Sequence, residues 1–150
     1  KNKKKQLLAA GIQMLSHGCP MLYYGDEVGM TGGNDPDCRR GMLWKEEKQD
    51  KAILEYYKKL LALRKSEPCI INGEQSILFT DDEKGLVIEE RKLFEKKKVR
   101  SVIIIYHNGK ETVELKDYVG KTNLLTGNNF DGKVRAYEIV VILMEGDKIG

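Results

Sequence analysis

The sequence predicts an antiparallel β-sandwich in its C-terminal half, preceded by a helix–strand–loop–helix segment. Apolar residues recur with helical spacing up to Ser66, which predicts helices there. From Gly73 onward, short runs of β-branched and aromatic residues alternate with turn signals such as Asn108-Gly109. We therefore expect a domain boundary near residue 70, which divides the chain into residues 1–69 and 70–150.

The first segment begins with a helix predicted over residues 3–17. Its apolar residues follow helical spacing, and Gly18 and Pro20 end it. The apolar run Met21–Tyr24 comes next and predicts a short buried strand. A helix, a short break and a buried strand are typical of a parallel α/β sheet.

A second helix is predicted over residues 46–66. Acidic residues such as Glu46 and Asp50 crowd its first turns, and basic residues such as Arg64 and Lys65 lie in its last turn. That order of charge suits the helix dipole. Pro68 is expected to end this helix.

The C-terminal half contains several short strand candidates separated by turns, which predicts a small antiparallel sandwich that folds independently. The longest apolar runs, Ser101–Tyr106 and Glu138–Leu143, are expected to be central strands buried on both faces. The candidates are Gln75–Thr80, Leu86–Arg91, Val99–His107, Thr112–Leu115, Lys121–Leu124 and Val134–Met144. The expected core residues are Leu78, Val87, Val102, Ile104, Leu124, Ile139, Val141 and Leu143.

Composition and charge exclude two classes of partner. The chain is 41% hydrophobic and 33% charged, which is ordinary for a globular protein. Its net charge of +3 arises from 26 basic and 23 acidic residues, a balance that does not favour nucleic acid. The basic runs at residues 3–5 and 96–98 are expected to be solvated. No apolar run has the length of a membrane span, so we expect no membrane partner.

The cysteines predict neither disulfides nor a metal site. Cys19, Cys38 and Cys69 are odd in number and widely spaced, which favours reduced thiols in a cytoplasmic protein. With His17 they lack the paired spacing of a zinc site. The acidic stretch at residues 34–37 lacks the glutamate and glycine of an EF-hand. We expect no metal and no cofactor. No signal peptide is visible, and the sequence, which lacks an initial Met, is expected to begin within a longer protein.

The loop Asn34–Arg40 contains the candidate binding residues. Pro36 stiffens the loop, Asp35 can accept hydrogen bonds from two adjacent hydroxyls, and Arg39 can donate a planar fork. If the segment after Pro36 makes a helical turn, Asp35 and Arg39 lie on one face of it at a spacing of four. Two interpretations remain open: a polyol-binding site, or a surface loop closed by an ion pair between these residues. Spacing alone favours the second.

Three ordered stretches resemble a known family. They are Tyr23-Tyr-Gly-Asp-Glu-Val-Gly-Met30, Gly33-Asn-Asp-Pro-Asp-Cys-Arg-Arg40 and Met42-Leu-Trp44. Together they resemble the last barrel strand and following loop of the α-amylase family of glycoside hydrolases, in its branch of cyclomaltodextrinase, neopullulanase and maltogenic amylase. The resemblance extends through about Arg64 and covers the C-terminal portion of such an enzyme.

The resemblance implies an architecture and a function. Residues 1–69 would be the C-terminal end, or remnant, of a catalytic (β/α)8 barrel, and residues 70–150 the C-terminal β-sandwich domain. Asp35 and Arg39 would bind a glucose unit on the non-reducing side of the cleavage point. The catalytic carboxylates would lie upstream of Lys1, so no catalytic residue is expected here, and Asp26 and Glu27 would be framework.

The enzyme containing this chain would hydrolyse α-1,4-glucosidic links of cyclodextrins, pullulan or maltooligosaccharides with retention of configuration. Its partner would be an α-glucan oligosaccharide, and enzymes of this branch often form homodimers. The isolated chain is expected to be inactive. Two alternatives remain open: a carbohydrate-binding module, for which the sandwich has few aromatic residues, or a purely structural sandwich with no activity.

Overall fold

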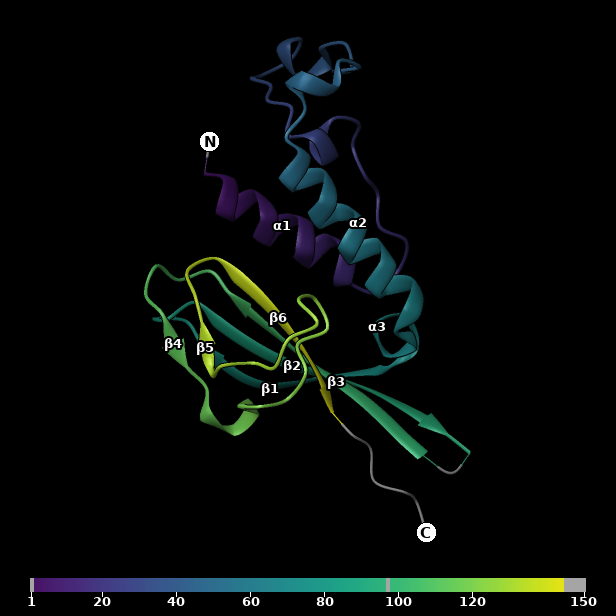
Figure 1. Ribbon diagram of the computed structural model, residues 1–150, viewed down its shortest axis with the longest axis vertical. Helices are drawn as coiled ribbons and strands as arrows, with labels where there is room; N and C mark the ends of the chain where they lie inside the picture. The colour runs from purple at the N-terminus through teal and green to yellow at the C-terminus, as the bar shows by residue number, and fades with distance from the viewer. Residues whose placement is uncertain (1, 97, 145–150) are drawn as a thin grey trace.

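The helices and the sheets form two layers, as the ribbon of the computed structural model shows (Figure 1). The structure describes residues 2–96 and 98–144. Outside the described residues lie Lys97, in the basic run expected to be solvated, residue 1 of the first predicted domain and residues 145–150 of the second. The helices are α1 (Lys3–Leu15), α2 (Lys51–Ser66) and α3 (Pro68–Asn72), with single 3-10 turns η1 (Asp26–Val28), η2 (Asp37–Arg39), η3 (Glu46–Lys48) and η4 (Lys116–Tyr118).

The C-terminal half forms an antiparallel four-stranded sheet in the order β1-β2-β3-β6, with a two-stranded sheet β4-β5 beside it. This arrangement fits the predicted sandwich. In the register of β3 and β6, Val102 lies opposite Leu143 and Ile105 opposite Val140. The run Ser101–Tyr106 lies in a central strand as predicted, but the run Glu138–Leu143 lies in β6 at one edge of the sheet, so its prediction as a central strand is wrong. The strands are β1 (Glu74–Asp81), β2 (Leu86–Glu95), β3 (Lys98–His107), β4 (Val113–Glu114), β5 (Lys133–Val134) and β6 (Glu138–Met144).

Two further strand predictions need correction. Residues 121–124 form no strand and make only isolated bridges, from Thr122 to Asn129 and from Asn123 to Ile142. The single strand predicted from residue 134 to 144 is split into β5 and β6. Between them Tyr137 has a φ of 58°, a left-handed conformation that no extended strand contains.

Strands β3 and β6 are buried on both faces, as their long apolar runs predicted. Alternate residues of β3 and β6 point to opposite sides, so one face packs on the helices and the other packs on Phe130 and Val134. The helix-facing cluster contains, among others, Leu8, Met14, Leu15, Ile53, Tyr57, Leu60, Val102, Ile104, Ile139 and Val141. The predicted boundary near residue 70 thus crosses one continuous core, and the division into domains stays a prediction.

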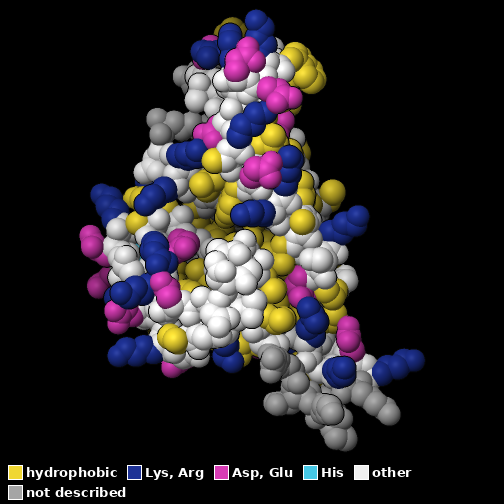
Figure 2. Space-filling model, viewed as in Figure 1, with side chains coloured by type: hydrophobic (Ala, Val, Ile, Leu, Met, Phe, Trp, Pro, Cys, Tyr) yellow, Lys and Arg dark blue, Asp and Glu magenta, His cyan; other side chains and the backbone are white. Residues whose placement is uncertain are grey.

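Most expected core residues are buried or half-buried, but Leu78 is 50% exposed and its prediction is wrong. It lies in β1, an edge strand that pairs only with β2 and that neither core cluster covers. A sequence pattern identifies apolar strand residues without indicating which strands the rest of the fold covers. On the face drawn in Figure 2, positive and negative side chains are interspersed.

Both predicted long helices are present, with small changes at their ends. Asn2 caps α1 by accepting a hydrogen bond from the backbone N–H of Lys5. Asp50 caps α2 in the same way, accepting from the N–H groups of Ala52 and Ile53, and the acidic residues before it form the separate turn η3. A side-chain cap at residue 50 satisfies donors that the first helical turn leaves unpaired, so α2 begins after it.

The predicted strand Met21–Tyr24 is not formed in the structure, and that part of the fold prediction is corrected. A parallel strand needs backbone partners beside it, and none of the described strands pairs with this segment. Instead the side-chain amide of Gln13 donates to the carbonyl oxygen of Met21. The Met21 side chain is 70% exposed. No described helix has the length and apolarity needed to cross a membrane.

Candidate functional site

The candidate binding residues lie on a loop that projects from the N-terminal end of α2, away from both sheets (Figure 1). The loop runs from η1 to η3 and contains the turn η2. Asp35 precedes this turn, joined to Pro36 by a cis peptide bond, and Arg39 is its last residue. The structure therefore places the two predicted site residues on either side of one tight turn, on a loop exposed to solvent.

Asp35 and Arg39 form an open ion pair. One guanidinium nitrogen of Arg39, Nη2, lies 2.8 Å from Oδ2 of Asp35. The side chain of Arg39 is 69% exposed and that of Asp35 is 59% exposed. Within residues 2–96 and 98–144, neither side chain makes another hydrogen bond. The remaining N–H groups of Arg39 and the second oxygen of Asp35 are therefore free to bind an external ligand. A polyol could use both, since it donates and accepts hydrogen bonds.

The neighbouring pair, Asp37 and Arg40, is closed instead. Arg40 donates from Nε to Oδ1 of Asp37 at 2.7 Å and from Nη2 to Oδ2 at 2.8 Å, a bidentate geometry. The backbone N–H of Gly33 also donates to Oδ2, at 2.7 Å. Hydrogen bonds from Arg40 and then Gly33 lower the pKa of Asp37 below its usual value. Both oxygens of this carboxylate are engaged, so this pair serves the loop itself.

A hollow of about 230 Å³ lies beside the loop. Its walls include Tyr23, Tyr24, Cys38 and Arg40. The two tyrosine rings lie with centroids 4.8 Å apart, and the Tyr24 hydroxyl donates to the carbonyl oxygen of Arg40 at 2.9 Å. This hollow is smaller than a typical ligand cavity. Its significance is that it connects the loop with the segment predicted as the last barrel strand.

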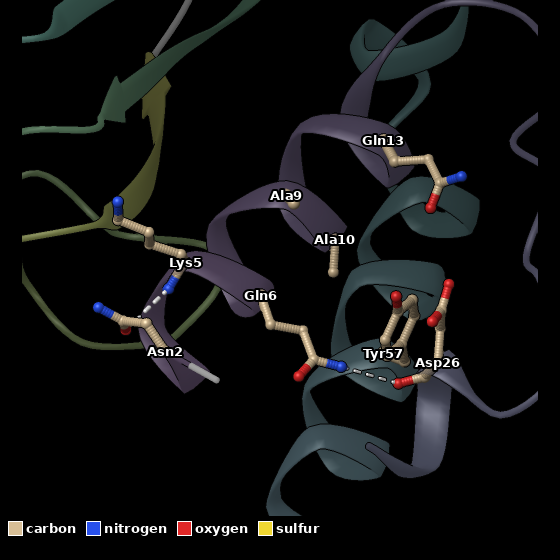
Figure 3. A pocket seen from close by; sticks show the side chains of 8 residues that line it. All are labelled: Asn2, Lys5, Gln6, Ala9, Ala10, Gln13, Asp26 and Tyr57. Atoms are coloured by element: carbon tan, nitrogen blue, oxygen red, sulfur yellow. Dashed lines mark hydrogen bonds between the residues drawn. The ribbon is translucent and has the colours of Figure 1, made fainter. Parts of the chain in front are cut away.

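A larger hollow of about 580 Å³ lies between α1 and α2, and neither Asp35 nor Arg39 lines it (Figure 3). Gln6 points across it and donates to the carbonyl oxygen of Asp26 at 3.3 Å, with the Tyr57 ring beside that contact. No motif in the sequence points to this place. The available signal was the pair of polar residues Gln6 and Gln13 flanking alanines on one helix face.

The other residues considered in the sequence have structural surroundings. Glu27 accepts a hydrogen bond at 2.8 Å from the backbone N–H of Gly25, two residues before it, so its carboxylate supports its own turn. The cysteines are free thiols, with Cys69 buried and Cys19 and Cys38 exposed. In the part of the chain that the structure describes, no three potential metal ligands gather in one place.

Comparison with known proteins gives clear relatives, although no protein-family model matches the chain. A cyclomaltodextrinase of Geobacillus thermopakistaniensis is 41% identical over 124 residues, which are 79% of this chain and 20% of that protein. Neopullulanase 2 of Thermoactinomyces vulgaris is 37% identical over 136 residues, 88% of this chain and 23% of that protein. Intracellular maltogenic amylase of Bacillus subtilis is 33% identical over 114 residues, 75% of this chain and 18% of that protein.

The fold has the same relatives. The crystal structure of maltogenic amylase from S. marinus superposes with a TM-score of 0.81 at 24% identity, and the match covers 99% of this chain and 20% of that one. The fold and the sequence matches thus make this chain a homologue of the C-terminal portion of α-amylase-family glycoside hydrolases. Within that family the curated homologues are cyclomaltodextrinase, neopullulanase and maltogenic amylase, which confirms the resemblance seen in the sequence. The chain spans about a fifth of the length of these relatives.

Proposed function

We propose that this chain is the C-terminal portion of a retaining α-glucan hydrolase that acts on α-1,4-glucosidic links of cyclodextrins, pullulan or maltooligosaccharides. Residues 1–69 form the end of its catalytic barrel and residues 70–150 its C-terminal sandwich. The names of the curated relatives, cyclomaltodextrinase and neopullulanase, support this class of substrate. The small share of those relatives that the chain spans supports a larger enzyme around it.

The observation that carries the role of the loop is the open pair of Asp35 and Arg39. A glucose unit presents adjacent hydroxyl groups, which a carboxylate can accept from and a guanidinium can donate to. The single 2.8 Å contact between the two side chains orients them while leaving most of their hydrogen-bonding groups unused. In this proposal the pair clamps a glucose unit on the non-reducing side of the scissile bond.

The clamp contributes to the reaction by orientation. Retaining hydrolysis needs two carboxylates that flank the scissile bond, and we place both on the part of the enzyme upstream of residue 1. A contact with a remote glucose unit supplies binding energy that holds the reacting bond in place between them. The enzyme is proposed to be cytoplasmic, since one relative is named intracellular and the cysteines are free thiols, and to act as a homodimer.

The test is kinetics of the full-length enzyme on maltooligosaccharides of increasing length. Arg39→Ala should lower kcat/KM by about tenfold to a hundredfold on long substrates, as expected for a lost charged hydrogen bond. Substrates too short to reach the clamp should be affected less. Arg135→Ala is the matched control, because Arg135 also forms an exposed ion pair with an aspartate four residues away. A length-independent loss with a lowered melting temperature would instead favour a loop held by a salt bridge.

The alternative of a sugar-binding sandwich finds little support in the arrangement of aromatic residues. Phe79 and Phe94 are exposed on β1 and β2. Phe79 lies opposite Ile88, and that position is six residues along β2 from Phe94. At a rise of about 3.4 Å per residue the two rings are about 20 Å apart, too far to stack on one glucose unit.

A further inference from the structure

The carboxylate of Asp37 connects the residues on either side of the clamp formed by Asp35 and Arg39. Its Oδ2 accepts from the N–H of Gly33, before the clamp, and from Arg40, after it. Asp35 and Arg39 lie between these two attachment points. The positions of both clamp residues therefore depend on a contact that neither of them makes.

The backbone of the loop approaches itself closely at the same place. A Cβ added to Gly32 would lie 2.8 Å from the Cα atom of Cys38, closer than side-chain carbons pack. The two arms of the loop thus touch at residues 32 and 38. The Asp37 carboxylate also bridges them, through its hydrogen bonds with Gly33 and Arg40. A loop closed in this way has little freedom to change the separation of Asp35 and Arg39.

Arg40 is also attached through its main chain. Its carbonyl oxygen accepts the 2.9 Å hydrogen bond from the Tyr24 hydroxyl, and Tyr24 belongs to the segment that enters the loop. The side chain of Arg40 therefore holds the turn through Asp37. Its carbonyl oxygen links the turn to Tyr24 in the preceding segment. This residue connects the clamp to its support.

We propose that Asp37 and Arg40 are positioning residues for the sugar clamp, an inference that rests on the proposed function. Their bidentate contact sets the separation and direction of the Asp35 and Arg39 side chains without itself touching the glucose unit. The planar fork of arginine is what makes this contact bidentate, and lysine cannot reproduce it although it keeps the charge. The geometry of Arg40, more than its charge, then determines how well a long substrate is held.

The experiment compares four variants of the full-length enzyme on short and long maltooligosaccharides. Arg40→Lys and Asp37→Asn should each lower kcat/KM on long substrates by about tenfold, because the clamp groups lose alignment. The shortest substrates should be cleaved as by wild type. Arg135→Lys, which alters an equally exposed Arg–Asp pair on the sandwich, should change neither. Arg39→Ala reports the clamp itself.

The melting temperature separates positioning from folding. An exposed ion pair contributes little to stability, so Arg40→Lys should melt as the wild type does. Equal losses of kcat/KM on all substrate lengths by Arg40→Lys and Asp37→Asn, together with a lower melting temperature, would show a structural role and overturn the inference.

The two proposals fail in different ways. If Arg39→Ala shows the length-dependent loss while Arg40→Lys and Asp37→Asn match wild type, the positioning role is wrong and the clamp stands. If Arg39→Ala shows no length-dependent loss, the clamp is wrong and the positioning role falls with it. Length-dependent losses in all three variants, with Arg135→Lys unchanged, are the supporting result.

Discussion

Arg64 closes the C-terminal end of the helix that contains Met14. Its Nη1 donates to the carbonyl oxygen of Met14 at 2.8 Å and to that of Ser16 at 2.7 Å, and its Nη2 donates to Gly18. The last carbonyl groups of an α-helix have no partner within the helix. A residue of α2, only 8% exposed, thus adds donors at the end of α1, where Ser16 already donates to the carbonyl oxygen of Ile12.

Replacing this cap should destabilise the chain. Arg64→Met keeps much of the apolar volume but leaves three carbonyl groups without their donor, and we expect a loss of about 2–3 kcal/mol. Urea unfolding followed by circular dichroism measures it. Lys65→Met, at the exposed neighbouring position, is the matched control. Equal unfolding midpoints for the two variants would contradict the capping role.

A second prediction concerns the buried ion pair between two residues of β2. Arg91 and Glu89 lie 2.8 Å apart with side chains 2% and 4% exposed. Tyr106 and Gln75 also donate to this carboxylate, and Arg91 donates to the carbonyl oxygen of Ile70. Arg91→Met leaves the Glu89 charge buried without its partner and should cost about 3–5 kcal/mol in the free energy of unfolding.

The double variant Glu89→Leu/Arg91→Met separates the pair from its surroundings. Because both charges are removed, it should be more stable than Arg91→Met alone, as measured by the same denaturant titration. If the double variant is the less stable of the two, the cost comes from lost packing and not from an unpaired charge.

A third prediction is the pH dependence contributed by Glu67. Burial raises the pKa of this side chain, but hydrogen bonds from Arg100 and from the backbone N–H of Cys69 outweigh it, so its pKa lies below the ordinary value of 4.5. The stabilisation is therefore present above that value and is lost as the pH falls through the lower native pKa.

Glu67→Gln should be less stable than wild type at neutral pH, and this difference should shrink as the pH falls. The difference in unfolding free energy should be largest near about pH 6 and should shrink toward about pH 3. Denaturant titrations at several pH values measure it. Glu95→Gln, at an exposed position, should leave the pH profile parallel to that of wild type. A constant offset between Glu67→Gln and wild type would contradict the assignment.

The predicted boundary near residue 70 has a direct test in the chain that begins at residue 70. The cluster around Phe130 and Val134 remains intact in that truncation, so we expect the sheet to form. The helix-facing residues Val102, Ile104 and Val141 lose their cover, each worth about 1.5–3 kcal/mol of burial. Circular dichroism should show β structure with a lower unfolding midpoint and increased dye binding. An unchanged midpoint would show that the helices contribute nothing to the sandwich.

The isolated chain should not hydrolyse cyclodextrins, pullulan or starch. The proposed function places both catalytic carboxylates outside it, and the Glu27 carboxylate is engaged by its own turn. Reducing-sugar release by purified chain is the measurement. Turnover that disappears on replacing Asp26 or Glu27 would contradict this prediction.

The sequence by itself determined the kinds of local structure. Helical spacing identified α1 and α2, and the apolar runs at residues 101–106 and 138–143 identified the strands β3 and β6, because these patterns follow from helix and strand geometry alone. The resemblance in residues 23–44 identified the family before any fold was known. It also singled out Asp35 and Arg39, whose role as a clamp stays a prediction.

Tertiary structure decided what local patterns cannot express. The run Met21–Tyr24 forms no strand because a strand exists only with partners, and Leu78 is exposed because neither core cluster covers β1. From the sequence, Arg64 is predicted to be a basic residue in the last turn of α2. In the fold it is buried against the C-terminal end of α1. The difference between the open pair at Asp35 and the closed pair at Asp37 likewise depends on which atoms the turn brings together. Spacing of charges alone does not show which hydrogen bonds form, because these depend on the conformation that the fold gives to the backbone.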